Sequence, residues 1–345
     1  MPSDGGQSKQ GQIQGLLDRA GLGAVVLGRF PNFAWYTGGA DNRVDHSAPF
    51  GVAQLVITPD RAYVLTNSIE AERMRIEQTP TLEVVSYPWY EDPASTLREL
   101  SAGKSIGSDG TLPESTDVSA EVALYRRVLD ADAIAQYREV GRLTVAAMDE
   151  AAATLAPGMS EFEAAAAVEA AYRRRGLYSP VVMGAGDDRI TQYRHPVVHD
   201  DVFHRRVMLV VCGERHGLYA DLTRFVHFEQ PDAELQVRFA ACGTILQRMR
   251  EEGTKPGTIL ADAFNACRRF YAEAGYPDEW KLHHQGGMTR YATREAVATP
   301  YAQDSIQVGQ AFAWNPSVTG AKAEETFVLT GSGPEIITRQ AEGAA

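Results

Sequence analysis

The sequence is poor in cysteine and in basic residues, and it has no long apolar run. Its three cysteines form no CxxC pair, which excludes a disulfide framework and a cysteine-rich zinc site, so we expect small buried thiols. Against 33 Lys and Arg stand 45 Asp and Glu, a formal net charge of -12, which argues against a nucleic-acid partner. No stretch has the pattern of a signal peptide or a membrane span. We therefore expect a cytoplasmic protein without a membrane partner.

What is present, in the first third of the chain, is an alternation of short β-rich runs and helical patterns. The runs are followed or separated by charged, helix-like segments such as residues 68–78, a pattern typical of an α/β domain. Turn and capping residues accumulate before Asp130, and we place a domain boundary there. This gives an N-terminal domain of residues 1–130 and a second domain of residues 131–345. The β-rich runs read "AVVLG", "VAQLVI", "AYVLT" and "LEVVSY".

The second domain contains an internal repeat. Each copy has a Pro-Gly turn, a hydroxyl residue, an amphipathic helix and a closing glycine, and the two copies lie 99 positions apart. We expect Ser160 and Thr258 to be the N-caps of the two helices, with Glu163 completing a capping box in the first. The matching pairs are Pro157 with Pro256, Gly158 with Gly257, and Gly176 with Gly275.

A carboxylate stands at the same place in each copy, Asp221 in "GLYADLT" and Glu324 in "GAKAEET". If a pseudo-twofold axis relates the copies, these two side chains converge on one site between them. On a strand, Asp221 and Thr223 share one face and Arg224 takes the other. An inward carboxylate must bind a cation or be hydrogen-bonded, and an ordinary ion pair with an arginine is the plain alternative to a functional site.

Three histidines are candidates for acid–base chemistry or for binding a ligand. In "KLHHQGGMTRY", His283 and His284 precede two glycines, where a chain can turn tightly and approach a ligand. Adjacent residues of an extended segment point to opposite faces, so we expect only one of the two in a given pocket. His195 precedes a proline, which holds it in an extended conformation that suits proton transfer; an exposed loop histidine is the alternative.

Taken together, these motifs resemble the creatinase, prolidase and methionine aminopeptidase superfamily over essentially the whole chain. The resemblance implies a mixed α/β fold: a creatinase-like N-terminal α/β domain, then a "pita-bread" domain with an internal pseudo-twofold repeat. It also implies a homodimer. The motifs that carry it are "YRHP" (193–196), "GLYADLTRF" (217–225), "HHQGG" (283–287) and "AKAEETFVLT" (321–330).

Metallopeptidases of this superfamily hold two metal ions with two Asp, one His and two Glu. By the resemblance, Asp221, His284 and Glu324 match three of these ligands, whereas Val211 and Asn315 stand where an Asp and a Glu belong. A further departure is Arg294, in the segment that follows the metal histidine. Two carboxylates do not balance two divalent ions, so we expect no cofactor, or else a single ion on Asp221, His284 and Glu324.

The resemblance implies catalysis by His195, His284, Asp221 and Glu324, with His195 transferring the proton. We expect a creatinase-like hydrolase that cleaves a C–N bond of a small molecule. The alternatives are a single-metal aminopeptidase or Xaa-Pro dipeptidase acting on short peptides, a peptide-binding domain without catalysis, and an isomerisation or elimination. Further contacts with substrate are expected from Asn315, Arg194, Trp314, His283 and Tyr193.

Overall fold

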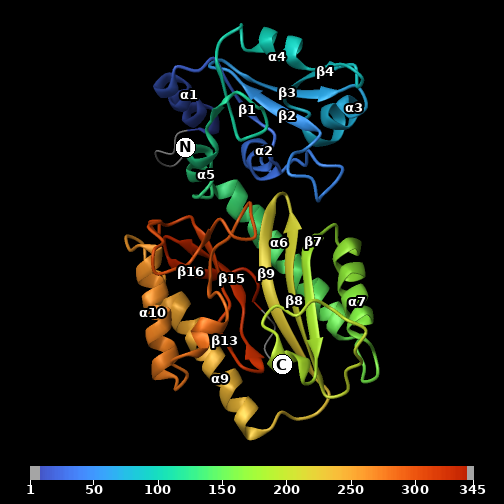
Figure 1. The fold of residues 1–345 in the computed structure, drawn as a ribbon, viewed down its shortest axis with the longest axis vertical. Helices are drawn as coiled ribbons and strands as arrows, with labels where there is room; N and C mark the ends of the chain where they lie inside the picture. Colours follow the sequence, from blue (N-terminus) through green and yellow to red (C-terminus); the bar gives the residue numbers. More distant parts are fainter. Residues whose placement is uncertain (1–7, 340–345) are drawn as a thin grey trace. The chain divides into compact units, whose positions relative to one another are not determined.

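The computed structural model describes residues 8–339, which divide into two compact units, the first ending at Arg127 and the second beginning at Val128 (Figure 1). No helix in the described part of the chain combines the length and apolar character needed to cross a bilayer.

The N-terminal unit is built on a six-stranded mixed sheet in the order β4-β3-β2-β1-β5-β6. Strands β1, β2 and β3 pair antiparallel, and the outer pairs are parallel. All four residues of β1 are buried, as expected for an apolar run in the middle of a sheet. The four predicted strands are present as β1 to β4. The bounds are β1 (Ala24–Leu27), β2 (Ala53–Ile57), β3 (Ala62–Asn67), β4 (Glu83–Tyr87), β5 (Ile106–Ser108) and β6 (Thr116–Asp117).

Helices pack beside this sheet, and Leu97 joins Val26 and Val56 in one buried apolar cluster. The helix expected over residues 68–78 is irregular, because a short α-helical turn continues as one π-helical turn at Met74–Gln78. The bounds are α1 (Lys9–Ala20), α2 (Phe30–Thr37), α3 (Ala71–Arg73), α4 (Ala94–Leu100) and α5 (Ser119–Tyr125).

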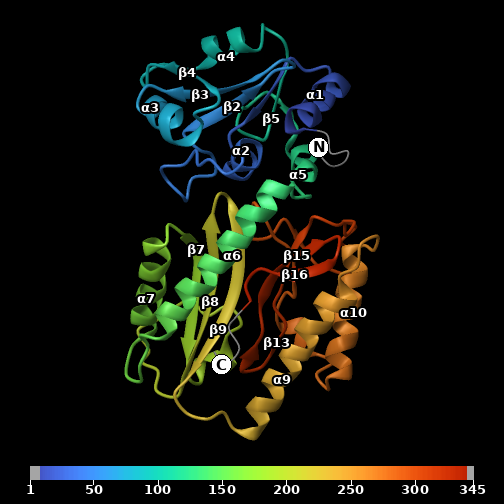
Figure 2. The ribbon, with the colours of Figure 1, turned by 180° about the vertical axis from the view of Figure 1, so that it is seen from behind.

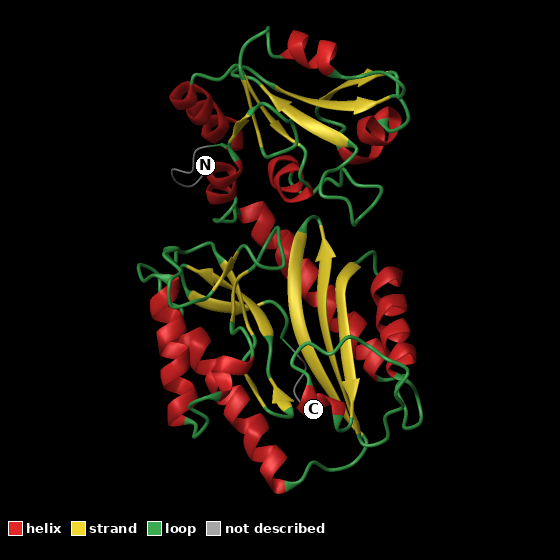
Figure 3. Cartoon of the chain, viewed as in Figure 1, coloured by secondary structure: helices red, strands yellow, loops and turns green. Residues whose placement is uncertain are grey.

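The C-terminal unit has two halves, each with a sheet on the inside and helices on the outside (Figure 3). In the first half, α6 lies across the sheet β7-β8-β9 (Figure 2). The bounds are α6 (Ala131–Ala152), α7 (Glu161–Arg174), β7 (Tyr178–Gly186), α8 (Arg189–Gln192), β8 (Arg206–Arg215) and β9 (Leu218–His227).

The second half has a five-stranded sheet in the order β11-β10-β12-β15-β16 and the small pair β13-β14. Its core includes Phe270, Phe312, Trp314 and Phe327. The helices are α9 (Ala233–Arg248), α10 (Leu260–Glu273), the π turn Met249–Gly253 and the 3-10 turn Glu279–Leu282. The strands are β10 (Gly286–Met288), β11 (Ala296–Val297), β12 (Ala311–Trp314), β13 (Ser317–Val318), β14 (Ala321–Lys322), β15 (Glu325–Thr330) and β16 (Gly333–Ile336).

The backbone carries the predicted repeat. Gly158 and Gly257, which precede α7 and α10, both have positive φ, at 94° and 87°. Ser160 caps α7 and forms the predicted capping box with Glu163. The expected cap at Thr258 is wrong: the residue before α10 is Ile259, and the Thr258 hydroxyl donates to a carbonyl oxygen of the preceding turn. The N-cap position is thus shared by both copies, but its side-chain hydrogen bond exists only in the first.

The two halves meet where β9 runs beside β15. The backbone N–H of Asp221 donates to Thr326 Oγ1 over 2.8 Å, and the same hydroxyl donates to the Asp221 carbonyl oxygen over 3.0 Å. One side-chain hydroxyl therefore replaces a pair of strand-to-strand backbone bonds. This contact brings the strand that carries Asp221 next to the segment that carries Glu324.

Candidate active site

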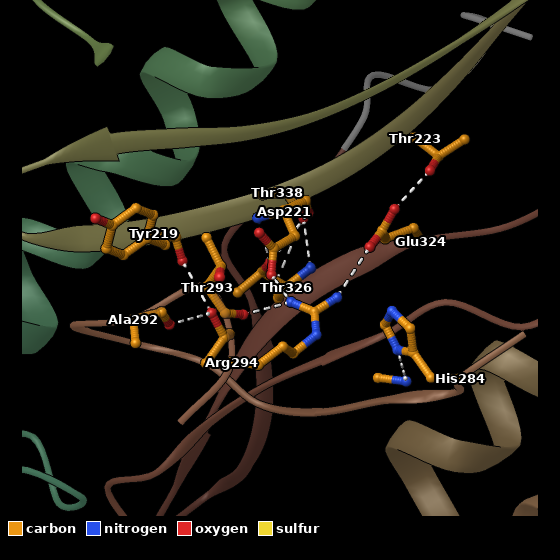
Figure 4. A network of polar contacts seen from close by, with 12 residues as sticks. Tyr219, Asp221, Thr223, His284, Ala292, Thr293, Arg294, Glu324, Thr326 and Thr338 are labelled. Carbon is orange, nitrogen blue, oxygen red and sulfur yellow. Dashed lines mark hydrogen bonds and ion pairs between the residues drawn. The ribbon is translucent and has the colours of Figure 1, made fainter. Parts of the chain in front are cut away.

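Both repeat-related carboxylates converge on one guanidinium. Asp221 on β9 is 0% exposed, and Glu324, just before β15, is 5% exposed. Arg294, in the loop between β10 and β11, pairs through Nη1 with Asp221 Oδ2, and its Nη2 lies 3.3 Å from Glu324 Oε1 (Figure 4). The ion pair with an arginine, set out above as the plain alternative, is therefore present, and the arginine bridges the two halves.

A second cation completes the cluster. Lys322 Nζ lies 3.0 Å from Glu324 Oε2, and both side chains are less than 5% exposed. Thr223 Oγ1 donates to the same oxygen over 2.6 Å, as the predicted shared face of Asp221 and Thr223 requires, whereas Arg224 on the opposite face pairs with Asp149 of α6. Two carboxylates and two cations leave this buried cluster without net charge.

The local charges shift the pKa values of both acids. Burial alone would raise the pKa of Glu324, but Lys322 and Arg294 outweigh it and lower that pKa to about 2. Burial raises the pKa of Asp221, with Arg294 opposing the shift. Glu324 is therefore a carboxylate throughout the physiological range.

Three imidazoles form a second cluster. His195 Nε2 lies 2.8 Å from His283 Nε2, and the His195 ring centroid is 4.5 Å from that of His283 and 5.2 Å from that of His284. The rings of His283 and His284 stack at 4.6 Å. The expectation that these two side chains point to opposite faces is wrong, since their rings stack and both lie near His195. The strand β10 begins only at Gly286, so the alternation of a regular strand does not apply to residues 283 and 284.

Burial keeps these imidazoles neutral. It lowers the pKa of His283 to about 2 and that of His284 to about 4, helped by the neighbouring cations Lys322 and Arg294 respectively. Burial also lowers the pKa of His195, with Lys322 adding to the shift. Near neutral pH all three rings carry one proton each and can both donate and accept hydrogen bonds.

The glycines after the histidines serve the sheet. Gly286 has a φ of 99°, and a Cβ there would lie 2.0 Å from the carbonyl oxygen of Ala313; a Cβ at Gly287 would lie 2.2 Å from that of Ala296. The close approach predicted for this segment is thus to the flanking strands β12 and β11. The tight turn still determines the tautomer of His284, whose Nδ1 accepts from the Gly286 N–H over 3.2 Å, so that its proton lies on Nε2.

The residue that faces Asp221 across the hairpin is Cys212. The β8–β9 register pairs Cys212 with Asp221 and Val211 with Leu222, so the side chain of Val211 points to the other face. Val211, which by the resemblance stands where an Asp ligand belongs, thus lies on the opposite face of this hairpin from Asp221. The Cys212 thiol is buried, and its pKa is raised well above the usual range by burial and then by Asp221. All three cysteines are buried and free, as predicted.

Two of the expected substrate contacts lie elsewhere. Trp314 is wholly buried in the core, where Nε1 donates to Thr254 Oγ1 over 2.9 Å, because its strand is covered by α9 and α10 on that side. Tyr193 follows α8, is 48% exposed and packs against Arg189 rather than against the histidines.

Two others are buried but differently engaged. Arg194 pairs with Glu279 and donates to Thr319 Oγ1 over 2.8 Å, so its guanidinium braces the loop before the histidines. Asn315 is 2% exposed, and its Oδ1 has no hydrogen-bond partner among residues 8–339. A buried acceptor without a hydrogen-bond partner costs free energy unless a ligand donates to it. Asn315 therefore remains a candidate for binding substrate.

A cavity of about 900 Å³ opens beside the carboxylate cluster. Thr223, Lys322 and Glu324 form part of its wall, and Phe225, Phe239 and Ile336 supply apolar surface. The residues that line it do not include His195, His283 or His284, so the cavity adjoins the carboxylate cluster rather than the histidines. This volume is within the range of small-molecule and cofactor sites.

The carboxylate cluster does not fit a pair of divalent ions. Its two negative charges are already balanced by Arg294 and Lys322. A divalent ion roughly 4 Å from the guanidinium would meet a repulsion of about 8 kcal/mol at an effective dielectric constant of about 20. Among the described residues, a cluster that could hold one ion is His195, His283 and His284, whose candidate ligand atoms lie within 4.8 Å of one another.

Sequence reasoning missed Lys322 and Cys212 and noted Arg294 only as a departure from a motif. Lys322 could have been found, since it lies two residues before Glu324 in an extended segment and so shares its face. Cys212 required the hairpin register. Arg294 lies 73 positions from Asp221, and only the tertiary fold brings them together.

Comparison with known proteins places these features in a family context. Residues 135–331 match metallopeptidase family M24, and residues 10–140 match the creatinase/prolidase N-terminal domain. An uncharacterized peptidase of Staphylococcus aureus (strain MW2) is 21% identical over 254 residues, which are 70% of this chain and 69% of the relative.

Solved structures share the fold over nearly the whole chain. A prolidase from Pyrococcus horikoshii OT3 has a TM-score of 0.82 at 19% identity, covering 98% of this chain and 99% of that one. A Xaa-Pro dipeptidase from Bacillus anthracis has a TM-score of 0.78 at 20% identity, covering 96% and 97%. The N-terminal domain of a FACT complex subunit from Cicer arietinum has a TM-score of 0.68 at 12% identity, covering 98% and 97%. These matches confirm the expected fold, a creatinase-like domain followed by a pita-bread domain.

Proposed function

The chain belongs to metallopeptidase family M24, whose members are hydrolases of peptide C–N bonds, and from this premise we propose that it hydrolyses short peptides, with Xaa-Pro dipeptides as the first class to test. We propose His195 as the proton-transfer group, and Arg294 and Lys322 as the source of the positive charge that a metal pair supplies elsewhere in the family. A small molecule with a creatine-like C–N bond is the second substrate class.

The observation that carries this proposal is the proximity of neutral imidazoles to a charge-balanced carboxylate cluster. The pKa of His195 is lowered first by burial and then by Lys322, and the pKa of His284 is lowered first by burial and then by Arg294. The cations of the carboxylate cluster therefore act on the histidine cluster as well. A neutral imidazole near a fixed positive charge can accept a proton from water while an oxyanion forms nearby.

In the proposed reaction, His195 is the tautomer with its proton on Nε2, the nitrogen that lies 2.8 Å from His283 Nε2, and its Nδ1 is unprotonated. That nitrogen takes a proton from water, and the water oxygen bonds to the carbonyl carbon. Collapse of the tetrahedral intermediate breaks the C–N bond, and the proton on His195 passes to the leaving nitrogen. The ammonium of Lys322 stabilises the oxyanion, and Asp221 and Glu324 hold the two cations in place.

The cavity supports a short substrate. Its volume of about 900 Å³ accommodates a dipeptide or tripeptide, and its wall combines the polar cluster with Phe225 and Phe239. We propose that the apolar surface contacts a substrate side chain.

A second candidate is a peptidase with one metal ion. Its supporting observation is the three-histidine cluster, whose ligand atoms lie within 4.8 Å of one another. An ion on Asp221, His284 and Glu324, the alternative considered from the sequence, would require Arg294 to leave its ion pairs.

A panel of Xaa-Pro dipeptides, unrelated dipeptides and creatine, assayed with and without chelator, tests these proposals. We expect turnover that survives chelation and is lost in His195→Ala but kept in the control His199→Ala, since His199 lies in the same loop with its side chain 61% exposed. Turnover that requires a metal would favour the second candidate. Peptide binding without any turnover would favour a binding domain and sink the enzymatic proposal.

The remaining proposals concern organisation. We propose that residues 1–130 and 131–345 are separate domains and that the chain is a cytoplasmic homodimer, both on the resemblance to the superfamily. Light scattering of the purified protein measures the oligomeric state, and a monomer at assay concentration would contradict the proposed dimer.

A further inference from the structure

We infer that Arg294 is a built-in substitute for a metal ion, and that removing its guanidinium turns the carboxylate cluster into a site for one divalent transition-metal ion. The inference concerns binding alone and does not depend on which substrate the protein hydrolyses. It assigns a role to a residue outside the segments that carry the motifs.

The guanidinium occupies the position where the two halves of the C-terminal unit meet. It is held by Asp221 from the first half and by Glu324 from the second, and it also donates to the carbonyl oxygen of Thr293 over 2.6 Å. Figure 4 shows the guanidinium between the two carboxylates, with His284 beside it. A single cation thus lies between acids that are 103 positions apart in the chain.

Ligand atoms for an ion remain once the guanidinium is gone. Asp221 Oδ1 is buried and accepts no hydrogen bond of standard geometry within residues 8–339. Asp221 Oδ2 and Glu324 Oε1, which now face Arg294, would lose their partner. The thiol of Cys212 lies opposite Asp221 on the neighbouring strand and supplies a soft donor that Co²⁺ and Zn²⁺ accept.

The charges favour the exchange. At present Asp221 and Glu324 are balanced by Arg294 and Lys322. Without Arg294 the cluster has one excess negative charge in a buried place, which favours a cation at the position that the guanidinium leaves. While Arg294 is present, a divalent ion would be repelled by the positive charges of Arg294 and Lys322.

The test is Co²⁺ binding to chelator-treated full-length protein, followed by isothermal titration and by the visible absorption of the ion. We expect Arg294→Ala to bind one Co²⁺ per chain at least about tenfold more tightly than the parent protein. Arg294→Lys, which keeps the charge, should bind as the parent does. Adding Asp221→Asn to Arg294→Ala should abolish the gain, and adding Cys212→Ser should reduce it and change the absorption spectrum. Because Arg294 also acts on His284 and His195, its loss would also strengthen an ion held by the three histidines, and the Asp221→Asn control separates that gain from one at the carboxylates.

Equal affinities of the parent and a folded Arg294→Ala protein would overturn the inference, as would a gain that survives Asp221→Asn. Parent protein that loses tight Co²⁺ binding on Asp221→Asn would overturn it as well, because the carboxylates would then hold an ion beside Arg294. If Arg294→Ala does not fold, Arg294→Gln, which fills more of the space with a neutral amide, takes its place under the same criteria. None of these readouts requires substrate, so a failed peptidase assay leaves the inference standing.

Discussion

Replacing Lys322 with methionine removes one of the two cations that neutralise the buried carboxylates. The ammonium lies 3.0 Å from Glu324 Oε2, and the two side chains are 4% and 3% exposed. At an effective dielectric constant of about 20, this attraction is worth about 5 kcal/mol. Burial of the ammonium offsets part of it, and Glu324 retains Thr223 and Arg294. We therefore expect a loss of about 3 kcal/mol in the free energy of unfolding, within the range for a broken buried ion pair.

Urea unfolding of the C-terminal unit measures this loss. The chain has four tryptophans, and replacing Trp35 and Trp89 by phenylalanine leaves Trp280 and Trp314 to report on the C-terminal unit alone. In this background, the double variant Lys322→Met/Glu324→Gln should recover most of the loss, because no buried charge is left uncompensated. A coupling free energy below about 0.5 kcal/mol in this double-mutant cycle would refute the ion-pair argument.

The same pair predicts an acid dependence. The folded-state pKa of Glu324 is lowered to about 2, below its usual value of about 4.3, so its contribution is complete above about pH 4.3 and is lost as the pH falls toward 2. Lys322→Met removes much of the cause of that shift. We expect its unfolding free energy to vary less than that of the parent protein over this range.

Four more substitutions have expected outcomes. Trp314→Phe loses the 2.9 Å hydrogen bond to Thr254 and should lower the free energy of unfolding in urea by about 1 to 2 kcal/mol. It should leave kcat unchanged, since Trp314 lies in the core. A large loss of kcat would show that Trp314 belongs to the active site after all. Gly286→Ala places a Cβ 2.0 Å from a carbonyl oxygen of β12 and should lower the free energy of unfolding by more than about 3 kcal/mol. Gly176→Ala, where no atom lies within 4 Å of the added Cβ, should lower it by about 1 kcal/mol. Equal losses in the two variants would contradict the packing argument. Burial lowers the pKa of folded His284 to about 4, so the unfolded chain binds the proton first and the free energy of unfolding falls as the pH drops from about 6.5 to 4. His284→Gln should make this fall smaller in urea unfolding at a series of pH values. An unchanged pH dependence would show that His284 does not cause it.

Much of the fold followed from local patterns. Strands β1 to β4 of the N-terminal sheet coincide with β-rich runs in the sequence, and the capping box at Ser160 marks the start of α7. The repeat predicted that Asp221 and Glu324 converge, because equal places in two copies meet near a shared axis. These features depend on residues close in sequence or on symmetry, and both can be recognised without coordinates.

The partners of the carboxylates could not be derived in this way. Arg294 comes from a loop between two short strands, and its position depends on the packing of the whole second sheet. The stacking of His283 on His284 depends on where β10 begins, which is fixed by contacts of Gly286 with β12. Cys212 faces Asp221 because of the length of the turn between β8 and β9, and a change of one residue there would present Val211 instead.

The two halves of the C-terminal unit are joined by the Thr326 hydroxyl and by the guanidinium of Arg294, and this arrangement bears on how the unit evolved. Each copy of the repeat contributes one acid and neither contributes both, so a polypeptide half as long as the C-terminal unit could have assembled such a cluster only by pairing with a second copy of itself around a twofold axis. Fusion of two copies released them from being identical. In a symmetric dimer every substitution appears in both copies. The fused chain can instead carry Asp221 in one copy and Glu324 in the other, with a single arginine, Arg294, supplied by the second copy alone.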